Sequence, residues 1–170
     1  EGDGQGGGGG QQRELRSGTQ DVPAAVGFGV AAEIAASTAD GEESRRRRVL
    51  RDRLIREVRQ VVPQAILRGH PTDRLESNAH FTFPDCEGDS LLFLLDAAGI
   101  SVSTGSACQA GVARASHVLL AMGLDEADAR GALRISIGHS TTDADVDAFL
   151  AALPGAVERA SRAGLATRPR

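Results

Sequence analysis

No tryptophan, tyrosine or lysine occurs in the 170 residues of this chain, and phenylalanine occurs only five times. With so little aromatic volume, a core must be built from leucine, valine, isoleucine and alanine. All 19 basic side chains are arginines, yet the formal net charge is −4, so no overall basic field favours nucleic acid. No apolar run approaches the ~20 residues that span a bilayer, and no secretory signal pattern opens the chain. We therefore expect neither a nucleic acid nor a membrane as partner.

Cysteine is also scarce. Cys86 and Cys108 are the only two, and they stand in different sequence contexts. This argues against a disulfide framework and favours reduced thiols in a cytoplasmic protein. The length suits a single domain with a real core.

The two ends of the chain differ in composition from the middle. Residues 1–10 are dominated by glycine and carry no apolar side chain, so we expect a flexible leader there. Residues 163–170 form a polar tail that we expect to fray. The folded part is therefore predicted to cover residues 11–162.

Helical and strand patterns alternate along the chain without an internal repeat. Asp21 and Thr142 are expected to cap helices, whereas Pro63, Gly99 and Gly123 are expected to end them. An α/β fold of the α+β kind is predicted, with a small sheet covered by helices. The spacing of apolar residues predicts helices over residues 22–37, 44–62, 88–98, 116–122 and 142–161, and strands over 65–68, 80–83, 100–103 and 131–137.

Cys108 stands in the segment STGSACQAG, residues 103–111, among small and flexible side chains. Free cysteine is commonly buried as a small hydrophobe, which is one interpretation. The other is a reactive thiol, because glycine, serine and alanine neighbours are too small and flexible to lock a core side chain. Cys86, between Asp85 and Glu87, is the poorer nucleophile, since adjacent carboxylates raise a thiol pKa.

Arg134 is a lone charge within an alternating apolar strand pattern. Alternation places Arg134 and Ser136 on the face opposite Leu133, Ile135 and Ile137. One interpretation is the solvated face of an edge strand. The other is a planar, bidentate clamp for a carboxylate, for which arginine is better suited than lysine.

Three further polar segments give weaker signals. The segment RELRSGT, residues 13–19, combines hydroxyls, a glycine and a following helix start, which suits an anion such as phosphate. The run Arg45–Arg48 is interpreted as a solvated helix face in preference to a patch for an acidic partner. His139 is interpreted as an ordinary loop histidine, and no metal site is predicted.

Taken together, these segments resemble one family, the cysteine desulfurases. Their order and spacing agree with the family over nearly the whole chain. The matching segments are GGGQQR with RSGT (8–13 and 16–19), EGDSLL (87–92, family Glu-Gly-Glu-Ser-Leu), STGSAC (103–108, Ser-Ser-Gly-Ser-Ala-Cys in the group serving iron–sulfur assembly) and LRISIG (133–138, Ile-Arg-Phe-Ser-Leu-Gly).

The resemblance implies a pyridoxal-phosphate enzyme of fold type I, in the class V aminotransferase family. Such enzymes take sulfur from L-cysteine, release L-alanine, and hold a persulfide on a mobile-loop cysteine for a sulfur acceptor or iron–sulfur scaffold protein. By this likeness Cys108 is the nucleophile, Arg134 binds the substrate carboxylate, and Thr19 contacts the cofactor phosphate across a homodimer interface. Residues 11–162 then correspond to the C-terminal part of the enzyme, including its small domain and mobile cysteine loop.

The sequence departs from the family in its lack of lysine. Members anchor the cofactor through a Schiff-base lysine in a Ser-x-His-Lys motif before the glycine-rich stretch, and Gln12 stands where they usually have glutamate. We therefore expect an incomplete enzyme that does not turn over L-cysteine by itself. The alternatives are a non-catalytic sulfur-relay or interaction module that accepts persulfide from a complete partner, and a nonfunctional fragment with an exposed apolar face.

Overall fold

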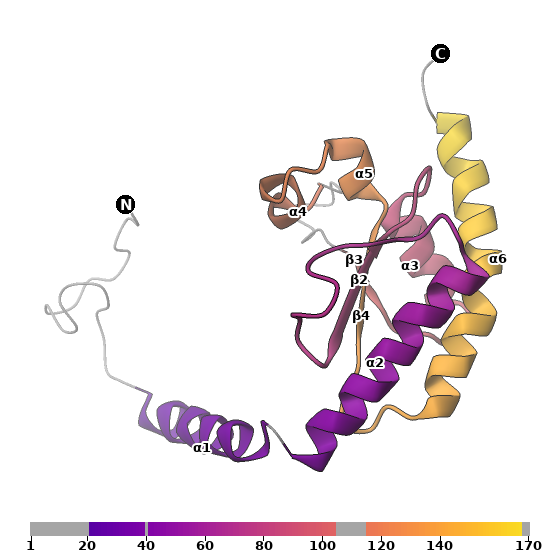
Figure 1. Cartoon of the computed structure of the whole chain (residues 1–170). Helices are drawn as coiled ribbons and strands as arrows, with labels where there is room; N and C mark the ends of the chain where they lie inside the picture. Colours follow the sequence, from indigo (N-terminus) through magenta and orange to yellow (C-terminus); the bar gives the residue numbers. More distant parts are fainter. Residues whose placement is uncertain (1–20, 40, 105–114, 168–170) are drawn as a thin grey trace, which may run out of the picture. The chain divides into compact units, whose positions relative to one another are not determined.

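The computed structural model describes residues 21–39, 41–104 and 115–167, and side chains as far as Arg162. The chain divides into two compact units, Glu1–Gly41 and Glu42–Arg170. Figure 1 labels the helices and three of the strands.

The first unit contains helix α1, Val22–Thr38. The Asp21 side chain accepts a hydrogen bond from the Ala24 amide at 3.1 Å, and Pro23 lies in the first turn, where no intrahelical donor is needed. The predicted N-cap is therefore confirmed. The large apolar side chains of this helix are all exposed: Val22, Val26, Phe28, Val30 and Ile34.

The second unit contains, in the part that the structure describes, a four-stranded antiparallel sheet with the strand order β1-β2-β4-β3. The strands are β1 (Ile66–Leu67), β2 (Asn78–Thr82), β3 (Ser103–Thr104) and β4 (Ala132–Ser136). The helices are α2 (Glu42–Val61), α3 (Gly88–Asp96), α4 (His117–Ala121), α5 (Glu126–Arg130) and α6 (Asp143–Thr167). The predicted α+β class is confirmed.

One face of the sheet carries the main core. The β2 side chains Ala79 and Phe81 and the β4 side chains Leu133 and Ile135 are buried together with apolar side chains of α2, α3 and α6. Figure 1 shows these three helices packed on this side of the sheet. Alternation along each strand then places every second side chain on the opposite face, where the candidate site lies.

Among the residues that the structure describes, the opposite face is covered at one end. Ala132 of β4 packs against Leu119 of α4 and Ala129 of α5 in a second, smaller cluster. Helix α5 was not predicted: it is short, begins at the Asp125 N-cap, and places only Ala129 in the core. The sequence EADAR gives too little apolar periodicity to be recognised as a helix.

The structure differs from the sequence analysis at two places. Strand β4 lies between β2 and β3, so the edge-strand interpretation of Arg134, one of the two left open, does not hold, although Arg134 does lie on the exposed face. Helix α6 runs to Thr167, past the end near residue 161 that the sequence predicts, and Pro154 lies inside it without ending it.

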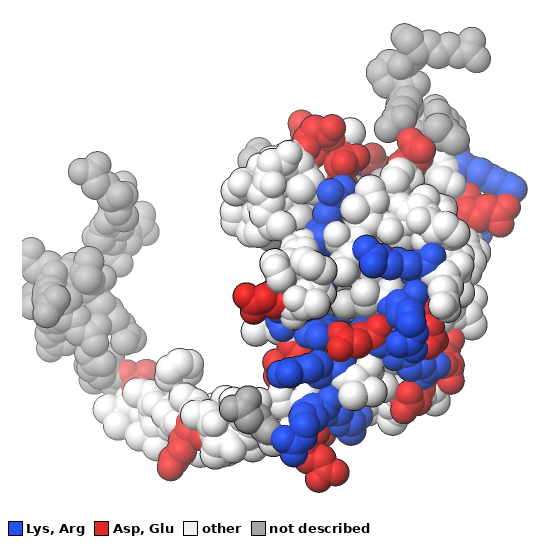
Figure 2. Space-filling model, viewed as in Figure 1, with Lys and Arg blue, Asp and Glu red and all other residues white. Residues whose placement is uncertain are grey.

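Two arginines at the start of α2 make intramolecular contacts, and one of them binds the loop between β4 and α6. Arg46 donates to the carbonyl oxygens of Thr141 at 2.6 Å and His139 at 2.7 Å, and Arg47 pairs with Glu43 and Glu76. Figure 2 shows basic and acidic side chains intermingled over this part of the surface. Within the basic run 45–48, these two arginines thus serve intramolecular contacts.

Among the described residues, no single helix is long and apolar enough to cross a membrane. The bent pair α1 and α2 together has the length and composition of a membrane span, and nothing beyond length and composition supports that.

Candidate functional site

Of the three predicted site residues, the structure describes one. Thr19 and Cys108 lie outside the described residues, so their predicted roles stay predictions. Arg134 is placed in the middle of β4, on the face of the sheet that α2, α3 and α6 leave open. Arg134 and its neighbours on this face therefore form the candidate site.

A row of polar side chains crosses the sheet at the level of Arg134. Its register partner on β3 is Ser103, and its register partner on β2 is His80. The Arg68 amide donates to the His80 carbonyl oxygen at 2.8 Å, which extends the row beyond β1. Because register partners share a face, Arg68, His80, Arg134 and Ser103 lie side by side on the open face.

The two arginines of this row differ in the hydrogen bonds and ion pairs that their side chains make. Arg68 donates from Nε to Thr82 Oγ1 at 2.7 Å and pairs with Asp128 of α5 at 3.1 Å. Arg134 is exposed and makes no side-chain hydrogen bond or ion pair with any residue that the structure describes. Its guanidinium is thus available to an anionic ligand, as a carboxylate clamp requires.

His80 is the residue of this site that the sequence analysis missed. It is half-buried, and its Nε2 atom is buried without a hydrogen-bond partner among the described residues. Burial lowers the pKa of His80, and the positive charges of Arg134, Arg68 and Arg74 lower it further. Both effects favour the neutral imidazole. Only its position between buried Ala79 and Phe81, facing away from the core, could have drawn attention to it in the sequence.

Strand β3 leads directly into the segment that carries Cys108. Thr104, its last residue, pairs with Leu133, and Cys108 follows four positions later in the sequence. The chain therefore enters this segment beside Arg134. On the C-terminal side of the segment, the buried Ser116 stands at the N-cap position of α4, where its side chain makes no capping hydrogen bond.

Cys86 occupies a different environment. It is 4% exposed in the main core, and its Sγ lies 3.8 Å from the Val157 carbonyl oxygen. Burial raises the pKa of the Cys86 thiol to about 11, with smaller contributions from Asp85 and Glu87. The sequence had identified the two carboxylates, but burial is the larger cause. Cys86 is therefore a structural thiol.

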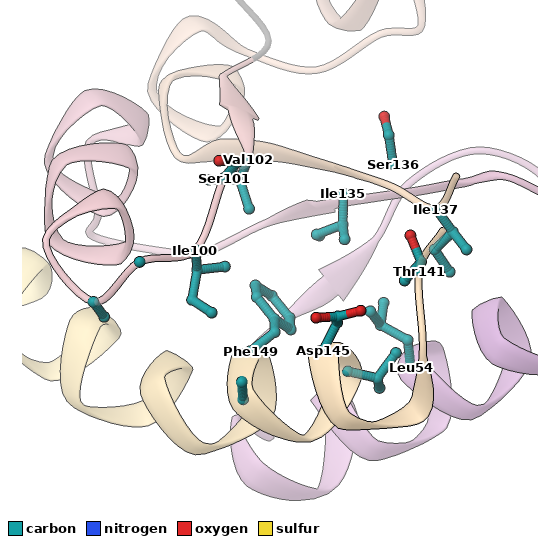
Figure 3. Close-up of a pocket in the computed structure, with 14 residues that line it drawn as sticks. Leu54, Ile100, Ser101, Val102, Ile135, Ser136, Ile137, Thr141, Asp145 and Phe149 are labelled. Atoms are coloured by element: carbon teal, nitrogen blue, oxygen red, sulfur yellow. The ribbon is translucent and has the colours of Figure 1, made fainter. Parts of the chain in front are cut away.

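A pocket of about 330 Å³ lies at the β3 side of the sheet, between the 98–102 segment, the end of β4 and the first turns of α6. Figure 3 shows Phe149 and Asp145 rising from α6 towards Ile135, with Ile100 to one side and Thr141 to the other. The Asp145 carboxylate accepts hydrogen bonds from the amide and hydroxyl of Thr142, both at 2.8 Å. The Asp145 carboxylate is thus already engaged in capping the N-terminus of α6. The remaining lining of the pocket is mainly apolar, and Arg134 is not part of it.

The residues present do not by themselves fit pyridoxal phosphate, the cofactor that the resemblance implies. The sequence has no lysine to hold it covalently. The open face offers Arg134, His80 and Ser103, which suit a substrate carboxylate better than a cofactor ring. These residues therefore suit the binding of a substrate carboxylate and not the anchoring of the cofactor.

Comparison with known proteins gives consistent matches. Residues 7–149 match the family Aminotransferase class-V. The chain is 59% identical over 160 residues to an IscS-like cysteine desulfurase of Mycobacterium tuberculosis, covering 94% of this chain and 40% of that protein. It is 49% identical over 152 residues to cysteine desulfurase IscS 1 of Archaeoglobus fulgidus, covering 89% of this chain and 39% of that protein. A solved NifS-like protein from Rickettsia africae matches with a TM-score of 0.72 and 30% identity, covering 89% of this chain and 39% of that one.

The chain spans about 40% of the length of the curated relatives that it matches. The structural matches confirm the predicted fold, that of a segment of a fold-type-I pyridoxal-phosphate enzyme. Because the family match extends over residues 7–149, and because the relatives named above are cysteine desulfurases, the chain belongs to the class V aminotransferase family and is similar to the cysteine desulfurases within it.

Proposed function

We propose that this chain forms part of a cysteine desulfurase, in which Arg134 binds the carboxylate of L-cysteine and Cys108 accepts its sulfur. One observation carries the proposal: Ser103, which opens the STGSAC segment, is the register partner of the unengaged Arg134. A substrate whose carboxylate is held at Arg134 is therefore bound beside the strand from which the Cys108 segment departs.

The proposed transfer proceeds through a persulfide. The thiolate of Cys108 attacks the sulfur of bound L-cysteine and forms a sulfur–sulfur bond. The carbon–sulfur bond of the substrate breaks, its electron pair stays with the carbon, and that carbon takes up a proton to give L-alanine. The remaining persulfide on Cys108 then passes its outer sulfur to an acceptor, such as an iron–sulfur scaffold protein. No external oxidant is needed.

Pyridoxal phosphate is the cofactor expected for this chemistry, because it acts as an electron sink that labilises a bound amino acid. We propose that the lysine which anchors it lies outside these 170 residues and that Thr19 contacts its phosphate. A cytoplasmic homodimer is the assembly proposed for the complete protein.

The test compares Cys108→Ser with Cys86→Ala, its matched control, in the protein that carries this sequence. After incubation with L-cysteine and pyridoxal phosphate, mass spectrometry of thiol-blocked peptides locates the persulfide, and released alanine is counted. The wild type and Cys86→Ala should carry one extra sulfur atom on Cys108, whereas Cys108→Ser should carry none and lose sustained alanine release. Alanine release by Cys108→Ser at the wild-type rate would refute the proposal.

The second candidate function is a sulfur relay, which needs the Cys108 segment beside β3 but no cofactor-anchoring lysine. It predicts that the 170-residue chain alone releases no alanine but gains a persulfide on Cys108 when mixed with an active cysteine desulfurase. Cys108→Ala should abolish that gain. A nonfunctional fragment would gain nothing and would form heterogeneous aggregates, which light scattering at low concentration distinguishes from a defined species.

A further inference from the structure

The Nε2 atom of His80 is buried and has no hydrogen-bond partner among the described residues. A buried polar atom without a hydrogen bond costs about 1–3 kcal/mol, so native structures normally supply a partner. His80 lies directly opposite Arg134 in the register of β2 and β4. The described residues leave its Nε2 without that partner.

Three arginines lie near His80, and two of them already donate to other groups, which leaves one available as a donor to Nε2. Arg68, beyond β1, is engaged with Thr82 and with Asp128 of α5. Arg74, in the loop between β1 and β2, donates to the carbonyl oxygens of His70 at 2.8 Å and Arg68 at 2.9 Å. Arg134 makes no such contact with a described residue, so its guanidinium is the neighbouring donor that remains uncommitted.

The chemistry of the two groups is complementary. A guanidinium carries five N–H donors and no acceptor, and a carboxylate bound side-on uses two of them. A neutral imidazole has one acceptor nitrogen, and the neutral state is what burial and the three arginines favour here. The acceptor is Nε2 in the tautomer that carries its proton on Nδ1.

We propose that His80 is a positioning residue for Arg134: when a carboxylate binds at Arg134, Nε2 of His80 accepts one N–H of the guanidinium and thereby aims the others at that carboxylate. The inference rests on the proposed role of Arg134. It assigns a specific contribution to His80, which holds the clamp in one orientation without adding charge that would compete for the carboxylate. Protonation of His80 removes the acceptor and places a further positive charge beside Arg134.

Two substitutions separate this role from a structural one. His80→Phe keeps a ring of similar shape and removes the acceptor, whereas His80→Gln keeps an acceptor oxygen near the position of Nε2 and does not titrate. In the holoenzyme that contains this sequence, His80→Phe should raise KM for L-cysteine about 10-fold with kcat within about twofold, the loss expected for one hydrogen bond to a charged group. His80→Gln should stay within about twofold of the wild type in both constants.

The pH profile gives an independent readout. In the wild type, KM should rise as acid protonates His80, and this rise should be absent in His80→Gln. Thermal unfolding of both variants controls for folding. A KM unchanged in His80→Phe, or an equal loss in His80→Gln and His80→Phe, overturns the inference.

Arg134→Gln distinguishes failure of the inference from failure of the proposed function. If Arg134→Gln leaves KM for L-cysteine unchanged, the proposed function fails and the inference fails with it. If Arg134→Gln raises KM but His80→Phe does not, only the inference fails. In the Arg134→Gln background, His80→Phe should have no further effect on KM, because the contact it removes is already lost.

Discussion

Arg51 of α2, only 3% exposed, donates a hydrogen bond to the Leu75 carbonyl oxygen at 2.9 Å. The same Nη1 atom reaches the Arg74 carbonyl oxygen at 3.2 Å, while Nε and Nη2 contact Asp52. A buried guanidinium thus satisfies main-chain acceptors of the loop that precedes β2. This contact connects α2 to the loop that leads into β2, the strand that carries His80.

Replacing Arg51 by methionine should destabilise the fold by about 1–3 kcal/mol, because the partly buried Arg74 carbonyl oxygen would lose this donor and that of Leu75 would keep only the Asn78 amide at 3.4 Å. The matched control is Arg56→Met on the same helix. Arg56 is exposed and pairs with Glu57, so its loss should cost less than about 0.5 kcal/mol. Urea unfolding followed by circular dichroism measures both, and equal losses would contradict this account of Arg51.

Gly131, immediately before β4, admits no side chain. A Cβ there would collide with the Phe83 carbonyl oxygen and lie 3.1 Å from that of Cys86. Gly131→Ala should therefore cost about 1–3 kcal/mol or lead to loss of the fold, because backbone rather than a flexible side chain must move. Gly155, inside α6, is the control, since nothing lies within 4 Å of the place that a Cβ would take: Gly155→Ala should stabilise by about 0.5–1 kcal/mol. Thermal unfolding shifts of opposite sign are the expected result.

The lowered pKa of His80 makes stability depend on pH. The unfolded histidine, with its ordinary pKa of 6.5, takes up a proton more readily than the folded one. The contribution of His80 is therefore fully present above pH 6.5 and is lost as the pH falls through the folded value. The free energy of unfolding should decrease on acidification in the wild type and less so in His80→Gln. His139→Gln, on an exposed loop, should keep the dependence due to His80.

The buried thiol of Cys86 should be unreactive in the folded protein. In a Cys108→Ser background, a thiol reagent at about pH 8 should modify Cys86 slowly, since the raised pKa leaves almost no thiolate and burial denies access. Addition of denaturant should make the same reaction fast. The raised pKa also predicts a stability that falls as the pH climbs from the unfolded value of 9.0 towards about 11. Rapid native-state modification would show that the core opens around Cys86.

The local features of this fold could be predicted from the sequence, whereas its long-range pairings could not. Alternation around Arg134 indicates the two faces of β4 correctly, because the period of two is a property of each strand. The neighbours of β4 depend on pairings with residues distant in the chain, which is why the sequence could not decide whether Arg134 lies on an edge strand. His80 was missed for the same reason: its significance arises only when β2 and β4 are in register.

The strand order has a consequence for how the protein is made. β4 completes the sheet between β2 and β3, although it follows both in the chain. During synthesis, the apolar side chain of Phe81 and the unpaired edge of β2 leave the ribosome before their partners Leu133 and Ile135 exist. The nascent chain therefore passes through a state in which the edge of β2 is unpaired and prone to aggregation. A chaperone that binds exposed apolar segments would act at this stage.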